Sequence, residues 1–245
     1  MRIRMTVRYD GTAFAGSQRQ PGKRTVAGTL TDELESLLGS PLRLVFASRT
    51  DRGVHADGNV CAFDAQLPFP VQRLPAILNR RLPEDLRVRE AGAAGPRFHP
   101  RFDAVGREYV YRVCRSADVP VDSMRYTAPY SGPWDAAAVA RGLELFAGEH
   151  RFAAFSRSVP DKHNAACTLE RIVAEERGLE VSWRFAADRF LWNMVCRIAG
   201  ALLGLAEGKV SLRQIEDALS GKRDFKLKPA PAKGLTLVAV RYERQ

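Results

Sequence analysis

A single carboxylate among arginines is the feature of this sequence best placed to do chemistry. Asp51 lies in the segment SRTDRGVH, residues 48–55, directly after the apolar run of residues 44–47. A strand that ends in a polar loop with a glycine turn can present a reactive side chain. An ionised aspartate beside a pocket the size of a base can attack an electrophilic carbon or stabilise a developing cation. Asp51 is therefore our candidate nucleophile.

The neighbours of Asp51 leave two interpretations open. Arg49 would share its face if the strand continues, and Arg52 follows directly, so nearby positive charge favours the ionised carboxylate. Alternatively, Asp51 caps the amides of Gly53 and Val54 in an Asx-type turn, with the arginines solvated. The local sequence alone favours the turn, because most Asp-x-Gly segments are turns.

Two tyrosines and one histidine are further candidates. Tyr109 and Tyr111 lie two residues apart on a predicted strand and would share a face, where aromatic rings can stack a flipped base. Paired tyrosines are also ordinary sheet residues, and without other evidence that interpretation is favoured. His55 could act as a general base near Asp51, but a turn histidine that hydrogen-bonds the backbone is the favoured assignment.

No motif predicts a metal or a cofactor. The four histidines lack the short spacing of a local metal site. Serine elbows, phosphate loops and dinucleotide fingerprints do not occur, so no nucleotide cofactor is expected. The cysteines form no C-x-x-C pair and are expected to be buried free thiols: Cys61, Cys114, Cys167 and Cys196.

The charge balance indicates a polyanionic partner. The chain has 38 basic and 28 acidic residues, which leaves a net charge of +10. Residues 71–115 hold ten arginines against five acids, so the excess is built into the fold and favours nucleic acid. The N-terminal residues lack the apolar region of a signal peptide, and the longest apolar run, residues 198–206, is about half a bilayer span. We expect a soluble cytoplasmic protein with no membrane partner.

Periodicity predicts an α+β protein. In the first half, strands are expected over residues 3–9, 42–47, 59–63 and 86–91, with helices over 26–38 and 74–82. Thr25 is the expected cap of the first helix and Gly39 its stop. In the second half, strands are expected at 107–115, 172–174, 179–185 and 235–242, with helices at 134–146 and 190–205. The Gly- and Ala-rich segment 91–96 is the best linker signal, so we predict two lobes, residues 1–95 and 96–245.

Several sequence blocks between residues 9 and 242 resemble the blocks of one protein family and occur in the same order. The string SRTDRGVHADGNV is similar to the signature G-R-T-D-x-G-V-H-A of the tRNA pseudouridine synthase A family. The other blocks that resemble this family are YDGTAFAGSQRQ, TVAGTL, LNRRLPEDLRV, FHPRFDAVGREYVYRV, FLWNMVCRIAG and PAPAKGLTLVAVRY.

The resemblance implies an isomerase that converts uridine to pseudouridine at tRNA positions 38, 39 and 40. It implies Asp51 as nucleophile, Tyr109 as the residue stacking on the target uracil and Arg49 near the flipped nucleotide. The implied fold is two ferredoxin-like or RRM-like α+β lobes with a continuous, largely antiparallel sheet flanked by helices. The implied partners are the anticodon stem-loop and elbow of tRNA and a second copy of the chain. The reaction is redox-neutral, so no cofactor is needed.

This sequence departs from the family pattern at two positions. Ser48 replaces the leading glycine, and Cys196 stands where the pattern F-L-x-x-M-V-R has an arginine. Arg197 follows one residue later, which rotates a helical side chain by about 100°. Arg197 is our candidate substrate-binding residue, while Arg49 or Arg52 could instead supply the positive charge.

Neither the mechanism nor the function class is unique at this point. Asp51 could add to C6 of uracil, add to C1′ of the ribose, or support a glycal route. A non-catalytic RNA-binding module would use the same basic surface and tyrosines. A basic nuclease is a weaker alternative, because the sequence contains no evident cluster of acidic metal ligands.

Overall fold

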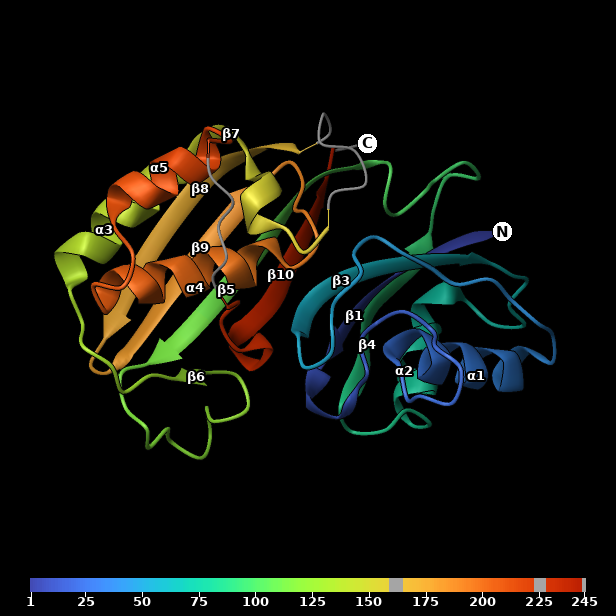
Figure 1. Cartoon of the computed structure of the whole chain (residues 1–245). Helices are drawn as coiled ribbons and strands as arrows, with labels where there is room; N and C mark the ends of the chain where they lie inside the picture. The colour runs from blue at the N-terminus through green and yellow to red at the C-terminus, as the bar shows by residue number, and fades with distance from the viewer. Residues whose placement is uncertain (159–164, 223–227, 244–245) are drawn as a thin grey trace. The chain divides into compact units, whose positions relative to one another are not determined.

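The protein is described here by a computed structural model covering residues 1–158, 165–222 and 228–243 (Figure 1). The chain divides into two compact units. The first comprises Met1–Val105 and Thr236–Gln245, and the second comprises Gly106–Leu235. Each unit combines a mostly antiparallel sheet with helices, so the predicted α+β class is confirmed.

The sheet of the first unit is built around the first strand. β1 (Arg2–Tyr9) lies between β3 (His55–Asp64) and β4 (Leu86–Ala93) and runs antiparallel to both. Along the other edge of β3, β2 (Val45–Phe46) pairs antiparallel and β10 (Leu235–Tyr242) pairs parallel. The order β4-β1-β3-β2 is that of a ferredoxin-like βαββαβ lobe.

Two helices accompany this sheet and lie on the same face of it in Figure 1. α1 (Val26–Leu38) begins where the Thr25 hydroxyl accepts a hydrogen bond from the Gly28 amide at 3.1 Å. It ends at Gly39, whose φ of 68° is left-handed, so both predicted ends are confirmed. α2 (Leu74–Asn79) is shorter than predicted and follows a 3₁₀ turn over Val71–Arg73.

The first unit buries apolar side chains on both faces of its sheet. Ile3 pairs with Phe63, and the neighbouring Arg4 pairs with Ala62, so Ala62 faces away from Ile3. A second core on the Ala62 face is formed by Ala47, Val60, Ala62 and Phe98, with Ala94, Val240 and Tyr242 packed against it.

This second core explains where the unit boundary falls. Phe98 inserts into it, and the Tyr242 hydroxyl donates to the Pro100 carbonyl at 2.6 Å. The first half of the expected linker is a strand: Ala91 and Ala93 belong to β4 and pair with Met5 and Ile3 of β1. The structural boundary therefore lies ten residues later than the expected 95/96 division, and the last strand belongs to the first unit.

The sheet of the second unit has the order β5-β9-β8-β7, antiparallel throughout. A short strand, β6, pairs parallel with β5 at the edge. The strands are β5 (Ala104–Cys114), β6 (Ala128–Pro129), β7 (Gly148–Arg151), β8 (Ala166–Arg177) and β9 (Glu180–Ala187). β8 and β9 form the predicted hairpin, with Gly178 at the turn in a left-handed conformation.

Three helices cover one face of this sheet (Figure 1). α3 (Ala136–Leu145) starts two residues later than predicted and is capped by the Asp135 side chain. α4 (Met194–Ala206) starts four residues later than predicted, because Asn193 adopts a left-handed φ of 61° that helical backbone does not allow. α5 (Leu212–Leu219) was missed, although Ser211 and Gln214 form a capping box that the sequence displays.

The four cysteines are free and buried, as predicted. Burial raises the pKa of the Cys167 thiol to about 11, so it is protonated at neutral pH. Within residues 1–158, 165–222 and 228–243, no group of histidine, cysteine or acidic side chains could hold a metal ion. The same residues include no helix with the length and apolarity needed to span a membrane.

Candidate active site

Asp51 sits in a turn between β2 and β3. The Val54 amide donates to the Asp51 main-chain carbonyl at 3.1 Å, and Gly53 supplies a left-handed φ of 78°. Asp51 is partly buried, whereas the flanking Arg49 and Arg52 are exposed. A turn is therefore present at Asp51, and a main-chain hydrogen bond closes it; capping by the Asp51 side chain, as in an Asx-type turn, stays a prediction.

A buried polar network fixes the residues that precede Asp51. The Thr50 amide donates to Ser17 Oγ at 2.8 Å, and the Thr50 hydroxyl lies 2.8 Å from the Tyr9 hydroxyl. Asn59 Nδ2 donates both to the Tyr9 hydroxyl and to the Ser48 carbonyl, at 3.1 and 3.0 Å. All five residues are buried, where such bonds are strong and their loss is costly. The Asp51 loop is thus anchored to the buried interior through Ser48 and Thr50.

Two glycines let the segment of residues 11–16 pack directly against this loop. A Cβ atom at Gly11 would lie 2.1 Å from the Val54 carbonyl oxygen. A Cβ atom at Gly16 would lie 2.9 Å from the Thr50 carbonyl oxygen, and Gly16 has a φ of 111°. Only glycine allows this approach, so the backbone on both sides of Asp51 is confined.

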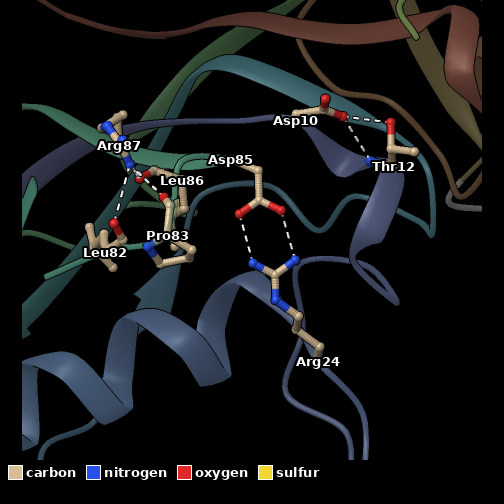
Figure 2. A network of polar contacts seen from close by, with 8 residues as sticks. All are labelled: Asp10, Thr12, Arg24, Leu82, Pro83, Asp85, Leu86 and Arg87. Atoms are coloured by element: carbon tan, nitrogen blue, oxygen red, sulfur yellow. Dashed lines mark hydrogen bonds and ion pairs between the residues drawn. The ribbon is translucent and has the colours of Figure 1, made fainter.

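Figure 2 shows polar contacts within and next to the glycine segment. Asp10 accepts hydrogen bonds from the Thr12 amide at 3.0 Å and the Thr12 hydroxyl at 2.6 Å, which caps the 3₁₀ turn Gly11–Ala13. Arg24 and Asp85 form a bidentate pair with both distances 2.7 Å, and this hydrogen bonding raises the pKa of Arg24. The Asp10 amide donates to the Asp85 carbonyl at 3.0 Å, which links the 3₁₀ turn to the Arg24–Asp85 pair.

His55 has the structural role that the sequence favoured. Its side chain is 1% exposed, and Nδ1 accepts a hydrogen bond from the Gly11 amide at 3.0 Å. The same nitrogen lies 3.2 Å from an Asp10 carboxylate oxygen. His55 therefore ties the start of β3 to the 3₁₀ turn, a positioning role for the Asp51 loop.

The two tyrosines of β5 lie in the second unit and differ in their surroundings. Both pair with β9 in regular register, Tyr109 with Phe185 and Tyr111 with Trp183. The Tyr109 ring meets Phe190 edge-on at 4.9 Å. Tyr111 is completely buried, and its hydroxyl donates to the Pro231 carbonyl at 2.9 Å. Tyr111 is a core residue, and burial raises the pKa of its hydroxyl.

The replacement of the family arginine is visible on α4. Cys196 is buried in the helix, and its carbonyl accepts a hydrogen bond from the Ala230 amide at 2.8 Å. Arg197, the fourth residue of α4, is partly buried, and its Nε atom has no hydrogen-bond partner within the described residues. Cys196 thus occupies a core position, which leaves Arg197 as the candidate substrate-binding residue on this helix.

The predicted site residues are divided between the two units. Asp51 and Arg49 belong to the first unit, whereas Tyr109 and Arg197 belong to the second. Their catalytic and binding roles stay predictions. Five residues that support the Asp51 loop were not predicted from the sequence. Four of them lie in the block YDGTAFAGSQRQ, whose resemblance to the family was the signal that could have revealed them; the five are Tyr9, Gly11, Gly16, Ser17 and Asn59.

The chain matches proteins of known family. A family model described as tRNA pseudouridine synthase matches residues 5–103 and 143–243, which include Asp51 and Arg197 but not Tyr109. A protein named tRNA pseudouridine synthase A from Halalkalibacterium halodurans is 38% identical over 236 residues, covering 96% of this chain and 90% of that protein. Proteins of the same name from a Geobacillus species and Chloroflexus aurantiacus are 37% and 39% identical. They cover 99% and 98% of this chain, and 98% and 88% of their own lengths.

Proposed function

Since the chain belongs to the tRNA pseudouridine synthase family, and is therefore an isomerase of tRNA uridine, we propose that it modifies positions 38, 39 and 40 in the anticodon stem-loop. The observation that carries this proposal is the Asp51 loop. Its carboxylate is presented on a turn held by Gly11, Gly16 and a buried polar network, inside the matched residues. The protein would act in the cytoplasm as a homodimer and bind the anticodon stem-loop and the elbow of tRNA.

The residues suit the bond changes of the reaction. The C1′–N1 bond breaks, a C1′–C5 bond forms, the C5 proton leaves and N1 gains a proton, so no oxidant, reductant or cofactor is required. Asp51 would act as the nucleophile or stabilise the detached sugar, and Tyr109 would hold the base by stacking while it rotates. Arg49 and Arg197 would bind the flipped nucleotide through its phosphates.

The proposal is tested by tritium release from a tRNA transcript carrying 5-tritiated uridine. We expect release from the wild-type protein, and none from a transcript in which positions 38–40 are cytidine. A protein that bound this tRNA but released no tritium would be a non-catalytic RNA-binding module. Cleavage of the transcript in magnesium would favour the nuclease alternative. Sedimentation of the free protein at twice the monomer mass checks the homodimer.

Replacing Gly11 with alanine is expected to slow pseudouridine formation about a hundredfold. The new carbon would overlap the Val54 carbonyl, so the 3₁₀ turn or the Asp51 loop must move by roughly 1 Å, and displacements of that size can cost this much rate. The overpacking should also lower the free energy of unfolding by about 1–3 kcal/mol. Single-turnover rates and thermal melts measure both effects.

Gly92 provides the matched control for this substitution. A Cβ atom at Gly92 would meet nothing within 4 Å. Gly92→Ala should therefore keep the wild-type rate and stability. If Gly11→Ala also kept the wild-type rate, the position of the Asp51 loop would not limit the chemistry.

A further inference from the structure

The first unit carries an exposed aromatic ring outside the residues assigned above. Phe102 is 77% exposed, more than any other phenylalanine or tryptophan in the part of the chain that the structure describes. We propose that Phe102 is a stacking platform for an unpaired base of the tRNA, separate from the pocket of the target uridine. This inference rests on the proposed function, because it takes tRNA as the bound RNA.

The ring of Phe102 is backed on one side. It stacks on the His99 imidazole with ring centroids 4.3 Å apart and an interplanar angle of 28°. With one face against His99 and most of the residue exposed, the opposite face is open to solvent. An open aromatic face with a fixed backing is the geometry on which single-stranded bases stack.

The loop that carries Phe102 is preorganised by His99. The amides of Arg101 and Phe102 both donate to His99 Nδ1 at 3.2 Å. The His99 amide donates to the Asp103 carboxylate at 3.0 Å, and the Asp103 amide donates to the His99 carbonyl at 3.1 Å. The ring position is therefore set before binding, which reduces the entropy lost when a base stacks on it.

The core of the first unit anchors the same loop. Phe98 is buried in the second core, and its carbonyl accepts a hydrogen bond from Arg2 Nε at 3.0 Å. The Pro100 carbonyl accepts a hydrogen bond from the Tyr242 hydroxyl at 2.6 Å. These anchors lie directly before Phe102 in the chain, so the exposed ring projects from a rigid base.

The charges around the ring favour RNA as the occupant. Arg97 and Arg101 are exposed on the same loop, while the carboxylate of Asp103 is engaged by the His99 amide. The chain as a whole has a net charge of +10. Exposed arginines on the loop that carries an open aromatic face suit the phosphate and base of a nucleotide, whereas a protein interface would be expected to be depleted in charge.

The test compares binding of an unmodified tRNA transcript to four variants by fluorescence anisotropy. Phe102→Ala and Phe102→Leu should weaken binding about fivefold to a hundredfold, whereas Phe102→Trp should bind within about twofold of wild type. Leu179→Ala is the matched control, since Leu179 is an exposed apolar residue of the β8–β9 hairpin and should be neutral. The salt slope of Phe102→Ala should equal that of wild type, because no phosphate contact is lost.

Two results would overturn the inference. Binding by Phe102→Ala or Phe102→Leu within twofold of wild type would exclude stacking as a source of affinity. A change in the sedimentation of Phe102→Ala without RNA would make this surface a contact between copies of the chain. Wild-type tritium release, measured in parallel, separates the two proposals: active wild-type protein with unchanged variant binding defeats the stacking inference alone. Absent release defeats the proposed activity.

Discussion

Replacing Asp51 with asparagine is expected to lower pseudouridine formation by at least about a thousandfold, while tRNA binding stays within roughly tenfold of wild type. Asparagine has nearly the same shape but is neither an anionic nucleophile nor able to stabilise a cationic sugar. The turn around Asp51 is closed by the main chain and anchored through Thr50, so the substitution should leave the fold intact. The loss of rate would then report the loss of the carboxylate.

Asp57 offers a matched acidic control in the same unit. It lies in β3 and forms an exposed ion pair with Arg8 at 3.2 Å, which contributes little to stability. Asp57→Asn should keep the wild-type rate of tritium release and the wild-type melting temperature. Normal turnover by purified Asp51→Asn would exclude Asp51 as the catalytic carboxylate.

The elements with strong local signals could be predicted from sequence. The ends of α1 follow from a side-chain cap at Thr25 and a left-handed glycine at Gly39, both of which act within one helical turn. β10 and the hairpin at Gly178 follow from alternation and turn chemistry. Asp51 is a candidate because its loop lies at a strand end and because several blocks resemble the family; its catalytic role stays a prediction.

What could not be predicted depends on contacts between distant residues. The approach of Gly11 to Val54 joins positions far apart in the chain, and no local pattern reveals it. The boundary between the units was displaced because Phe98 packs beside Tyr242, which turns an apparent linker into part of a core. The start of α4 was misplaced because Asn193 adopts a left-handed conformation inside an apolar run that otherwise has helical periodicity.

Cys196 stands where the family pattern has an arginine. The sequence identified the missing arginine but offered Arg197, Arg49 and Arg52 as substitutes. The structure makes Cys196 a buried core residue and gives Arg197 a donor atom with no hydrogen-bond partner among the described residues. Arg197 is therefore the substitute that we prefer, and its role in binding an anionic group stays a prediction.

Replacing Tyr109 with phenylalanine is expected to slow tritium release about a hundredfold or more, with tRNA affinity within about twofold of wild type. The ring would still stack on the uracil, but the hydroxyl that we expect to assist removal of the C5 proton would be absent. Because Tyr109 is 8% exposed and its ring packs against Phe190, the phenylalanine ring should keep the same position.

Tyr111 is the control for this substitution, since it lies on the same face of β5 and differs in having a structural hydroxyl. Tyr111→Phe loses the hydrogen bond to Pro231 and should cost about 1 kcal/mol of stability with no change in rate. The decisive measurement is the isotope effect of deuterium at C5, which should increase in Tyr109→Phe and stay at the wild-type value in Tyr111→Phe. An unchanged rate and isotope effect in Tyr109→Phe would limit Tyr109 to stacking, since another group must then remove the proton.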